Sequence, residues 1–345
     1  MTDTPERIRT VVVGYGLAGA VFHTPLIEAD PAYELAGIVT ADPQRAAAAA
    51  AKYPRARILP SVDAAADAGG FELAVVAAPT PHHVDVASRL LSAGLATVVD
   101  KPLAVRSADA QALIDLAAAR GVALTVFQNR RWDGDFLTVR KLVESGALGQ
   151  VRRFESRFEW LSARPRPEWK KGTAGRDGGG VAYDLGSHLI DQAIQLFGPV
   201  SAAVHGELDS HVAVVNDDDT FIALTHESGV RSHLSMSSLV AQRGFRFRVL
   251  GAESAYTKWG LDPQEAQLAS GMSPLDPAFG VEDPSAYGRI GRDGALTAVP
   301  TEHGGYRDFY ARLALALRGG GPLPVDPRDA LVPIRIIEAL HARTP

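Results

Sequence analysis

Short apolar runs alternate with helix-forming stretches over the first third of the chain. The runs consist mostly of Val, Ile, Leu and Ala and have no polar face, which is typical of strands buried on both sides of a parallel sheet. The pattern predicts strands at 11–13, 33–39, 72–78, 95–99 and 122–127, with helices at 18–29, 43–52, 63–70 and 107–119. This order predicts a Rossmann-like α/β domain over residues 1–127, with a doubly wound parallel sheet.

After residue 127 the pattern changes to alternation of apolar and polar residues. It predicts strands at 151–160, 201–208, 219–226, 230–238 and 245–250, and helices at 134–145, 306–317 and 328–341. Residues 161–180 and 262–301 lack periodicity and are expected to be irregular. Consecutive strands favour a large, open, mostly antiparallel sheet, so residues 128–345 are expected to form a second, α+β domain. In the last strand we expect Arg246 and Arg248 on a wetter face of the sheet.

Charge and cysteine content exclude several classes of protein. The net charge is -5, so nothing favours nucleic acid or an anionic membrane as a partner. The chain has no cysteine, which excludes disulfides, thiolate nucleophiles and Cys-zinc sites and fits a reducing cytoplasm. The first residues are polar and lack the apolar core of a signal peptide, and no apolar run approaches the ~20 residues that cross a bilayer. We therefore expect a cytoplasmic protein.

The first strand leads directly into a glycine-rich loop. Gly14, Gly16 and Gly19 follow it at the G-x-G-x-x-G spacing of dinucleotide-binding folds. In such a loop the first glycine allows the tight turn, the second lets a pyrophosphate reach the backbone, and the third lets the helix pack on the sheet. The pyrophosphate then lies at the positive end of that helix. The loop predicts binding of NAD or NADP.

The end of the second strand bears on the choice between these two cofactors. NAD-binding folds place an acidic residue about 20 residues past the last glycine, where it binds the ribose hydroxyls. Here the position is Thr40, which has no charge to repel a 2′-phosphate, and Arg45 follows closely enough to pair with one. The sequence therefore favours NADP. NAD stays open, because a small shift of register would make Asp42 the ribose ligand.

Two further strand ends carry polar side chains. His83 follows the strand at 72–78, where it is expected either to line the cofactor or to face solvent at a helix start. Lys101 ends the strand at 95–99, where it either points into the ligand crevice or lies on a solvated face. A lysine in the crevice can polarise a substrate oxygen.

In the second half, Asp184, His188 and Asp191 are spaced for one side of a helix. A histidine flanked by carboxylates stays basic and keeps a fixed orientation, as a general base requires. A structural Asp–His pair and a metal site are the alternatives. No metal site is expected, since no other histidine is placed to complete one.

The assembled motifs resemble the Gfo/Idh/MocA family of oxidoreductases over nearly the whole chain. The motifs are the glycine loop, Asp100-Lys101-Pro102 in place of the family's usual Glu-Lys-Pro, and Asp184-x-x-x-His188. The stretches that begin at Asn129 and Tyr183 are similar to the NADP-dependent scyllo-inositol dehydrogenase branch. The resemblance implies that Lys101, Asp184 and His188 are catalytic. It also implies that the second sheet joins subunits, as a homodimer or homotetramer.

These residues lead to a specific hypothesis, the oxidation of a secondary hydroxyl of an inositol, polyol or sugar by the nicotinamide cofactor. The candidate cofactor-binding residues are Gly14, Tyr15, Gly16, Leu17, Gly19, Thr40, Arg45, Ala78, Pro79, Thr80, His83, Asp100, Lys101 and Asn129. The candidate substrate-binding residues are Lys101, Trp132, Asp184 and His188. Two alternatives are an enzyme that retains its cofactor and cleaves a glycosidic bond, and a non-catalytic nucleotide-responsive binding protein.

Overall fold

The computed structural model describes residues 6–162, 172–211 and 215–343. The chain forms two compact units, which we describe separately. The first consists of Met1–Asn129, Gln264–Phe279 and Gly305–Leu331, and the second of Arg130–Pro263, Gly280–Gly304 and Val332–Pro345. The chain thus leaves the first unit close to residue 127 and returns to it twice. Within the predicted irregular segment 161–180, residues 163–171 lie outside the described residues.

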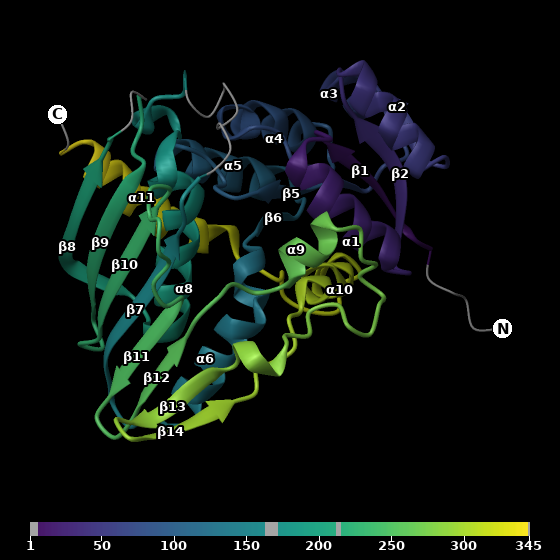
Figure 1. Cartoon of the computed structure of the whole chain (residues 1–345). Helices are drawn as coiled ribbons and strands as arrows, with labels where there is room; N and C mark the ends of the chain where they lie inside the picture. Colours follow the sequence, from purple (N-terminus) through teal and green to yellow (C-terminus); the bar gives the residue numbers. More distant parts are fainter. Residues whose placement is uncertain (1–5, 163–171, 212–214, 344–345) are drawn as a thin grey trace. The chain divides into compact units, whose positions relative to one another are not determined.

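A parallel sheet forms the centre of the first unit (Figure 1). Over the described residues its six strands have the order β3-β2-β1-β4-β5-β6. Their bounds are β1 Ile8–Val13, β2 Tyr33–Val39, β3 Arg57–Leu59, β4 Leu73–Val76, β5 Ala96–Asp100 and β6 Leu124–Phe127. The order confirms the doubly wound fold, in which ligands bind beyond the carboxyl ends of the strands where the order reverses, here between β1 and β4.

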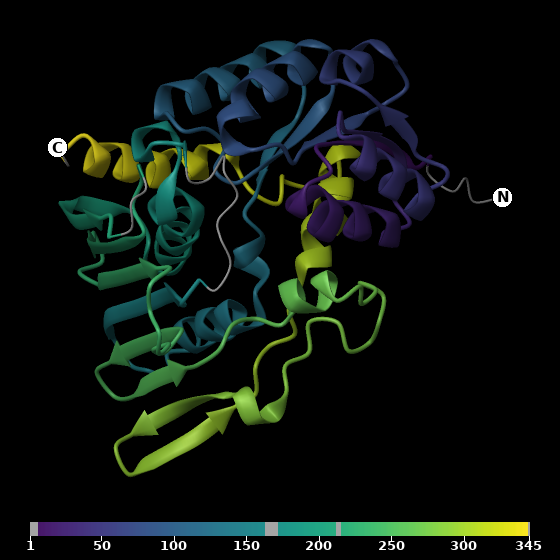
Figure 2. The same cartoon turned by 45° about the horizontal axis from the view of Figure 1, so that its top comes forward.

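Helices cover both faces of this sheet. Helices α4 and α5 pack together on one face, and α1 and α10 pack together on the other (Figure 2). The helices are α1 Thr24–Ala29, α2 Pro43–Lys52, α3 Val62–Asp67, α4 His83–Ser92, α5 Ser107–Arg120, α9 Gln264–Ala269 and α10 Tyr306–Leu317. Short turns complete the unit at η1 Ala18–His23, η2 Thr80–His82 and η7 Pro327–Ala330. Helices α9 and α10 come from the two returning segments.

The helix expected at 18–29 is divided by its own sequence. The backbone stays helical from the π turn η1 into α1, and Pro25, which has no N–H to donate, lies in α1 just past the π turn. His23 ends the π turn and is fully buried, with its Nδ1 atom 2.7 Å from the Tyr310 hydroxyl oxygen. Burial lowers the pKa of His23 to about 4, so the ring is neutral at pH 7. The contact with Tyr310 joins η1 to α10.

The second unit is built on a mixed sheet. Over the described residues its eight strands have the order β14-β13-β12-β11-β7-β10-β9-β8, and all neighbours are antiparallel except β7 and β10. The strands are β7 Val151–Glu159, β8 Val200–Asp209, β9 Asp219–His226, β10 Arg231–Ser237, β11 Phe247–Gly251, β12 Ala255–Lys258, β13 Gly288–Arg292 and β14 Ala295–Val299. The expected open, mostly antiparallel sheet is therefore confirmed.

Helices lie on one face of this sheet. Helix α8 (Ser187–Phe197) packs on β7 and β10, and α6 (Gly134–Glu144) packs on α8 (Figure 1). The remaining elements are α11 Leu331–His341 and the short turns η3 Asn129–Trp132, η4 Gly175–Asp177, η5 Ala182–Gly186 and η6 Pro284–Ala286. On the other face β7 carries the ion pairs Arg153–Glu155 and Arg157–Glu159. Along β7, charged and apolar side chains therefore point to opposite faces of the sheet, as the period of two predicts.

The expectation that residues 262–301 are irregular is wrong. The segment contains α9 and the hairpin of β13 and β14. The strand β14 is mostly exposed and β13 contains two glycines, so neither shows a contrast between a buried and an exposed face. Strands β3 and β12 are also absent from the prediction, because elements of three or four residues are too short to show a period.

Arg246 is placed differently from the expectation. It precedes β11 and is buried, whereas Arg248 within β11 is exposed. The Arg246 guanidinium lies 3.9 Å from the ring centroids of both Phe158 and Phe247. It donates to the Ser156 hydroxyl at 2.6 Å and to the Gln192 side-chain oxygen at 2.9 Å. The aromatic contacts and hydrogen bonds hold a charge inside the unit that the alternation pattern places outside.

Arg246 is therefore expected to stabilise the fold strongly. Burial lowers the pKa of Arg246 to about 10, so it stays charged at neutral pH, and its Nε atom lies 3.7 Å from an oxygen of the buried Asp135. We expect Arg246→Ala to lower the free energy of unfolding by about 3–5 kcal/mol, because it leaves a buried carboxylate without this charge partner. The exposed Arg248→Ala is the matched control, with an expected change within about 0.5 kcal/mol. Urea denaturation followed by circular dichroism measures both, and equal effects would contradict the assignment.

Candidate active site

The glycine loop connects β1 to η1 and is shaped by close backbone contacts. Gly14 has a φ of +100°, and a Cβ atom on it would lie 2.6 Å from the Ala77 carbonyl oxygen. A Cβ atom on Gly19 would lie 2.0 Å from the Gly14 carbonyl oxygen. No side chain fits at either position, so both glycines are required for the turn and for the packing of the helix, as the motif predicts.

Gly16 has a different surrounding from the other two. A Cβ atom there would meet only the Nη1 atom of Arg45, at 3.9 Å. The space beside the Gly16 backbone is thus open, and a guanidinium borders it. Leu17, the next residue, is 70% exposed. This cradle fits a dinucleotide phosphate, which needs free backbone and nearby positive charge.

The turn after β2 assigns Asp42 a structural contact. Its Oδ1 atom accepts hydrogen bonds from the backbone N–H groups of Gln44 and Arg45, both at 2.9 Å. Asp42 is therefore the N-cap of α2, a role that uses one carboxylate oxygen and fixes the direction of the side chain. Thr40 at the end of β2 accepts a hydrogen bond from the Asp42 N–H at 3.3 Å. The Arg45 guanidinium lies between Asp42 and the glycine loop, with Nε 4.0 Å from Asp42 Oδ2 and Nη1 beside the loop.

Two adjacent strand ends bring further candidates to the same edge of the sheet. Strands β4 and β5 pair in register, and each is followed by a turn with candidate residues. After β4 come the half-buried Ala78 and Thr80 and the exposed Pro79. After β5 the Oδ1 atom of Asp100 accepts a hydrogen bond from the Lys101 N–H at 2.8 Å, and the Lys101–Pro102 peptide bond is cis. Lys101 is half-buried at the edge where the fold predicts ligand binding.

His83 is buried, which excludes the solvent-facing alternative. Its two ring nitrogens lie within hydrogen-bond distance of the carbonyl oxygens of Pro102 and Ala78. His82, beside it in the sequence, is the exposed member of the pair. Asn129, which follows β6, is also buried.

In the second unit, Asp184 and His188 belong to one helical stretch, but their spacing is not that of a regular α-helix. Asp184 lies in the π turn η5, whereas His188 lies in α8. A π turn holds more residues per turn than an α-helix, and residues four apart still lie close to one face in it, so the geometry is compatible with the predicted shared face. Asp184 is half-buried and His188 is buried, with its ring edge-on to Phe158 at 6.4 Å. π turns are frequent at functional sites.

The third predicted member, Asp191, has a different partner. Its carboxylate forms a bidentate ion pair with Arg131, with distances of 2.8 Å to Nε and 2.5 Å to Nη2. The pair joins α8 to the turn η3, which contains Trp132. Trp132 directly follows Arg131 in the sequence and is buried. Asp191 therefore anchors the turn that carries a candidate substrate-binding residue.

Asp217 is a buried carboxylate beside the turn of Asp184, and the sequence did not reveal its burial. Its Oδ2 atom accepts hydrogen bonds from the Ala182 N–H at 2.7 Å and from the Thr220 hydroxyl at 2.8 Å. A Cβ atom on Gly180 would lie 1.8 Å from its Oδ1 atom, so the glycine makes room for this carboxylate. Burial raises the pKa of Asp217. The run of three glycines before the helix was the available signal, because it leaves room for a buried neighbour.

The C-terminal helix supports the same turn. The ring of His341 on α11 stacks on that of Tyr183, with centroids 5.5 Å apart and an angle of 6° between the ring planes. Its Nε2 atom lies 3.8 Å from Asp217 Oδ1. Burial lowers the pKa of His341, so the ring is neutral at pH 7. Tyr183 and Asp184 are adjacent, and the contacts to Tyr183 therefore fix the turn that carries Asp184.

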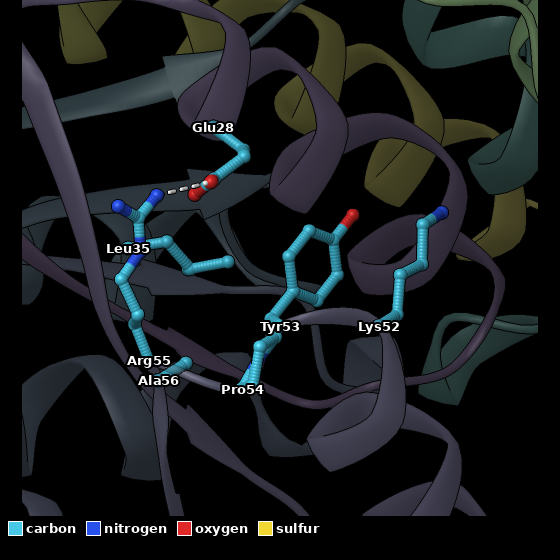
Figure 3. A pocket seen from close by; sticks show the side chains of 7 residues that line it. All are labelled: Glu28, Leu35, Lys52, Tyr53, Pro54, Arg55 and Ala56. Carbon is cyan, nitrogen blue, oxygen red and sulfur yellow. Dashed lines mark hydrogen bonds and ion pairs between the residues drawn. The ribbon is translucent and has the colours of Figure 1, made fainter.

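A cavity elsewhere in the first unit contains none of the predicted site residues. It has a volume of about 260 Å³, and its lining is Glu28, Leu35, Lys52, Tyr53, Pro54, Arg55 and Ala56 (Figure 3). Arg55 and Glu28 form an ion pair across it at 3.0 Å. Across residues 6–162, 172–211 and 215–343, no three His, Asp or Glu side chains are grouped to hold a metal ion. No helix in the same residues has both the length and the apolar character to span a bilayer.

Comparisons with known proteins agree with this geometry. Residues 8–128 match the family model described as the oxidoreductase family, NAD-binding Rossmann fold, and residues 140–342 match its C-terminal alpha/beta domain. The chain is 31% identical to scyllo-inositol 2-dehydrogenase (NADP(+)) IolW of Bacillus subtilis (strain 168), with 97% of this chain and 93% of that protein covered. It is 26% identical to the inositol 2-dehydrogenase of Rhizobium meliloti (strain 1021), with 76% and 79% covered.

A solved structure also matches over nearly the whole chain. The crystal structure of an oxidoreductase from Bacillus cereus has a TM-score of 0.85 and 26% identity, and covers 97% of this chain and 96% of that one. The matches span both units and include the glycine loop and the helix of His188. The chain belongs to the Gfo/Idh/MocA family of NAD(P)-dependent oxidoreductases.

Proposed function

We propose that this protein oxidises, reversibly, a secondary hydroxyl of an inositol, polyol or sugar with NADP as the hydride acceptor. The observation that carries the proposal is the open backbone at Gly16 bordered by Arg45, in a chain that is similar to an NADP-dependent inositol dehydrogenase over 97% of its length. The nicotinamide, when bound, supplies the hydride chemistry. The protein binds, orients and moves the proton.

The choice of NADP over NAD follows from charge. A ribose carrying a 2′-phosphate needs a cation and no opposing carboxylate. Arg45 supplies the cation beside the loop, and the Asp42 carboxylate is held by its N-cap hydrogen bonds and by the Arg45 Nε atom, 4.0 Å from Oδ2. Thr40 can donate its hydroxyl proton to a phosphate oxygen. Tyr15, Leu17 and Gly19 complete the loop, and Ala78, Pro79, Thr80, Asp100 and Asn129 border the cofactor at the neighbouring strand ends.

His188 is assigned the proton transfer. A buried imidazole next to the reacting carbon takes the hydroxyl proton as the hydride leaves that carbon, and returns it in the reverse direction. Lys101 polarises the same oxygen and stabilises the negative charge that develops on it. Asp184 accepts a hydrogen bond from a neighbouring hydroxyl, and Trp132 contacts the ring of the substrate. Hydride transfer and proton transfer together convert the alcohol to a ketone.

Subunit association and location complete the proposal. We propose a homodimer or homotetramer formed through the sheet of the second unit, whose charged face carries no helix from α6 or α8. We propose a cytoplasmic location because the chain has no cysteine.

The direct test is turnover. Purified protein is mixed with NADP or NAD and a panel of inositols, polyols and aldoses, and nicotinamide reduction is followed by absorbance. We expect reduction with NADP and at least one compound of the panel. Cofactor binding without reduction across the panel would overturn the proposal and favour the retained-cofactor or binding-protein alternative.

Lys101 provides the first test of the chemistry. Because it stabilises charge only in the transition state, Lys101→Ala should lower kcat by about 100-fold or more. Lys141→Ala is the matched control, since Lys141 is exposed and pairs with Glu302 at 2.6 Å. Steady-state kinetics at saturating cofactor give both values. A Lys101→Ala variant with unchanged kcat would remove Lys101 from the mechanism.

Arg45 provides the test of cofactor choice. A charged hydrogen bond to a phosphate contributes about 1.5–3 kcal/mol, so Arg45→Ala should lower the NADP-to-NAD ratio of kcat/KM by about 10- to 100-fold. The loss should lie in NADP use, with NAD use little changed. Arg55→Ala, an exposed arginine that pairs with Glu28 instead, is the control. Equal losses with both cofactors would contradict the role given to Arg45.

A further inference from the structure

The side chain of His83 connects the two turns that follow β4 and β5. Its Nδ1 atom lies 2.7 Å from the Pro102 carbonyl oxygen, and its Nε2 atom lies 2.9 Å from the Ala78 carbonyl oxygen. The residue is only 1% exposed. Pro102 follows Lys101 directly, so one of the two contacts is made to the turn that carries the lysine.

The protons on this ring decide which contacts are hydrogen bonds. A carbonyl oxygen only accepts, and a neutral imidazole has a single N–H group. A neutral ring can therefore donate to one of the two carbonyls, and only a doubly protonated ring can donate to both. The contact with Pro102 is buried, whereas the contact with Ala78 is only partly buried. Loss of the bond to Pro102 would leave a buried acceptor unsatisfied, which is the costlier loss.

We propose that His83 is a positioning residue for Lys101: the neutral ring donates its Nδ1–H to the Pro102 carbonyl, and protonation of Nε2 adds a second bond to the Ala78 carbonyl. The single bond fixes the Lys101–Pro102 turn at the end of β5. The second bond ties that turn to the one after β4. His83 thereby contacts the backbone of both turns and acts on the reaction through Lys101. The kinetic consequence rests on the proposed function, but the protonation pattern does not.

The charges around the ring set the pH at which the second bond forms. Burial lowers the pKa of His83, while the carboxylate of Asp100 and the two carbonyls act in the opposite direction. Lys101 on the same strand end and His23 on η1 also face the ring and oppose a second proton. The second proton therefore binds on the acidic side of the usual imidazole range. At neutral pH the ring makes the bond to Pro102 alone.

Two variants separate the two nitrogens. The amide nitrogen of Asn lies near the position of Nδ1, and that of Gln lies near the position of Nε2. We expect His83→Asn to keep kcat within a few-fold of the original, because it retains a donor to Pro102. We expect His83→Gln to lower kcat by about 10- to 100-fold, as a misplaced catalytic group does, with the KM for NADP little changed.

The neighbouring His82 serves as the control, since it is exposed and has no part in the proposed site. His82→Gln should leave kcat unchanged, and thermal midpoints of all three variants show that they are folded. We expect kcat to stay close to the original value in His83→Asn and to fall in His83→Gln. A purely structural role for His83 would not distinguish the two variants in this way. Equal kcat values for the two folded His83 variants would overturn the proposal.

The protonation pattern is tested without turnover. In the full chain labelled with ¹⁵N-histidine, the His83 signals are assigned as those lost in His83→Asn. We expect Nδ1 to be protonated and Nε2 bare at pH 8, with Nε2 taking up a proton as the pH is lowered. A bare Nδ1 at pH 8 would overturn the proposal even in an active enzyme. The expected pattern in a protein inactive on the whole panel would instead locate the failure in the proposed function.

Discussion

The first unit depends on one close approach of backbone to backbone. At Gly19 the chain passes so near the Gly14 carbonyl that a Cβ atom would lie 2.0 Å from its oxygen, and a Cβ atom on Gly14 would lie 2.6 Å from the Ala77 carbonyl oxygen. Three segments therefore meet without side chains between them: the end of β1, the start of the helix, and the end of β4. This contact places the loop at the start of the helix, the end at which an anion binds. The packing of the helix and the binding of an anion thus both require glycine in this loop.

In the second unit, the helix α8 carries polar and charged side chains at buried positions. Arg131 neutralises Asp191, Asp217 holds the start of the π turn, and Arg246 lies between two phenylalanine rings with a hydrogen bond to Gln192. Each group replaces the water that burial removes with a fixed partner. The helix that carries His188 is consequently held by directed bonds as well as by apolar contact. Such bonds restrict rotation of the helix more than apolar packing does.

The sequence predicts the architecture of both units and a set of candidate residues. Where the prediction is wrong, the cause is physical. The apolar runs gave the strands of the parallel sheet except β3, since three residues carry no period. The hairpin of β13 and β14 was missed because its exposed residues show no contrast between faces. The burial of Asp217 was not predicted, since nothing local in the sequence distinguishes a buried carboxylate from a solvated one. The contacts of His83 exist because the ends of β4 and β5 are neighbours in the sheet. The order of residues along the chain does not reveal this.

The two returning segments also determine when the nucleotide-binding unit can be completed during synthesis. His23 contacts Tyr310, which lies 287 residues later, and Tyr33 donates to the backbone of the same residue. At 5–20 residues per second, a ribosome needs about 15–60 s to make that length of chain. Until then one face of the parallel sheet has no α10 to cover it, and its apolar surface is open to chaperones. The enzyme is therefore not built one domain at a time from the N-terminus, because its first domain closes almost last.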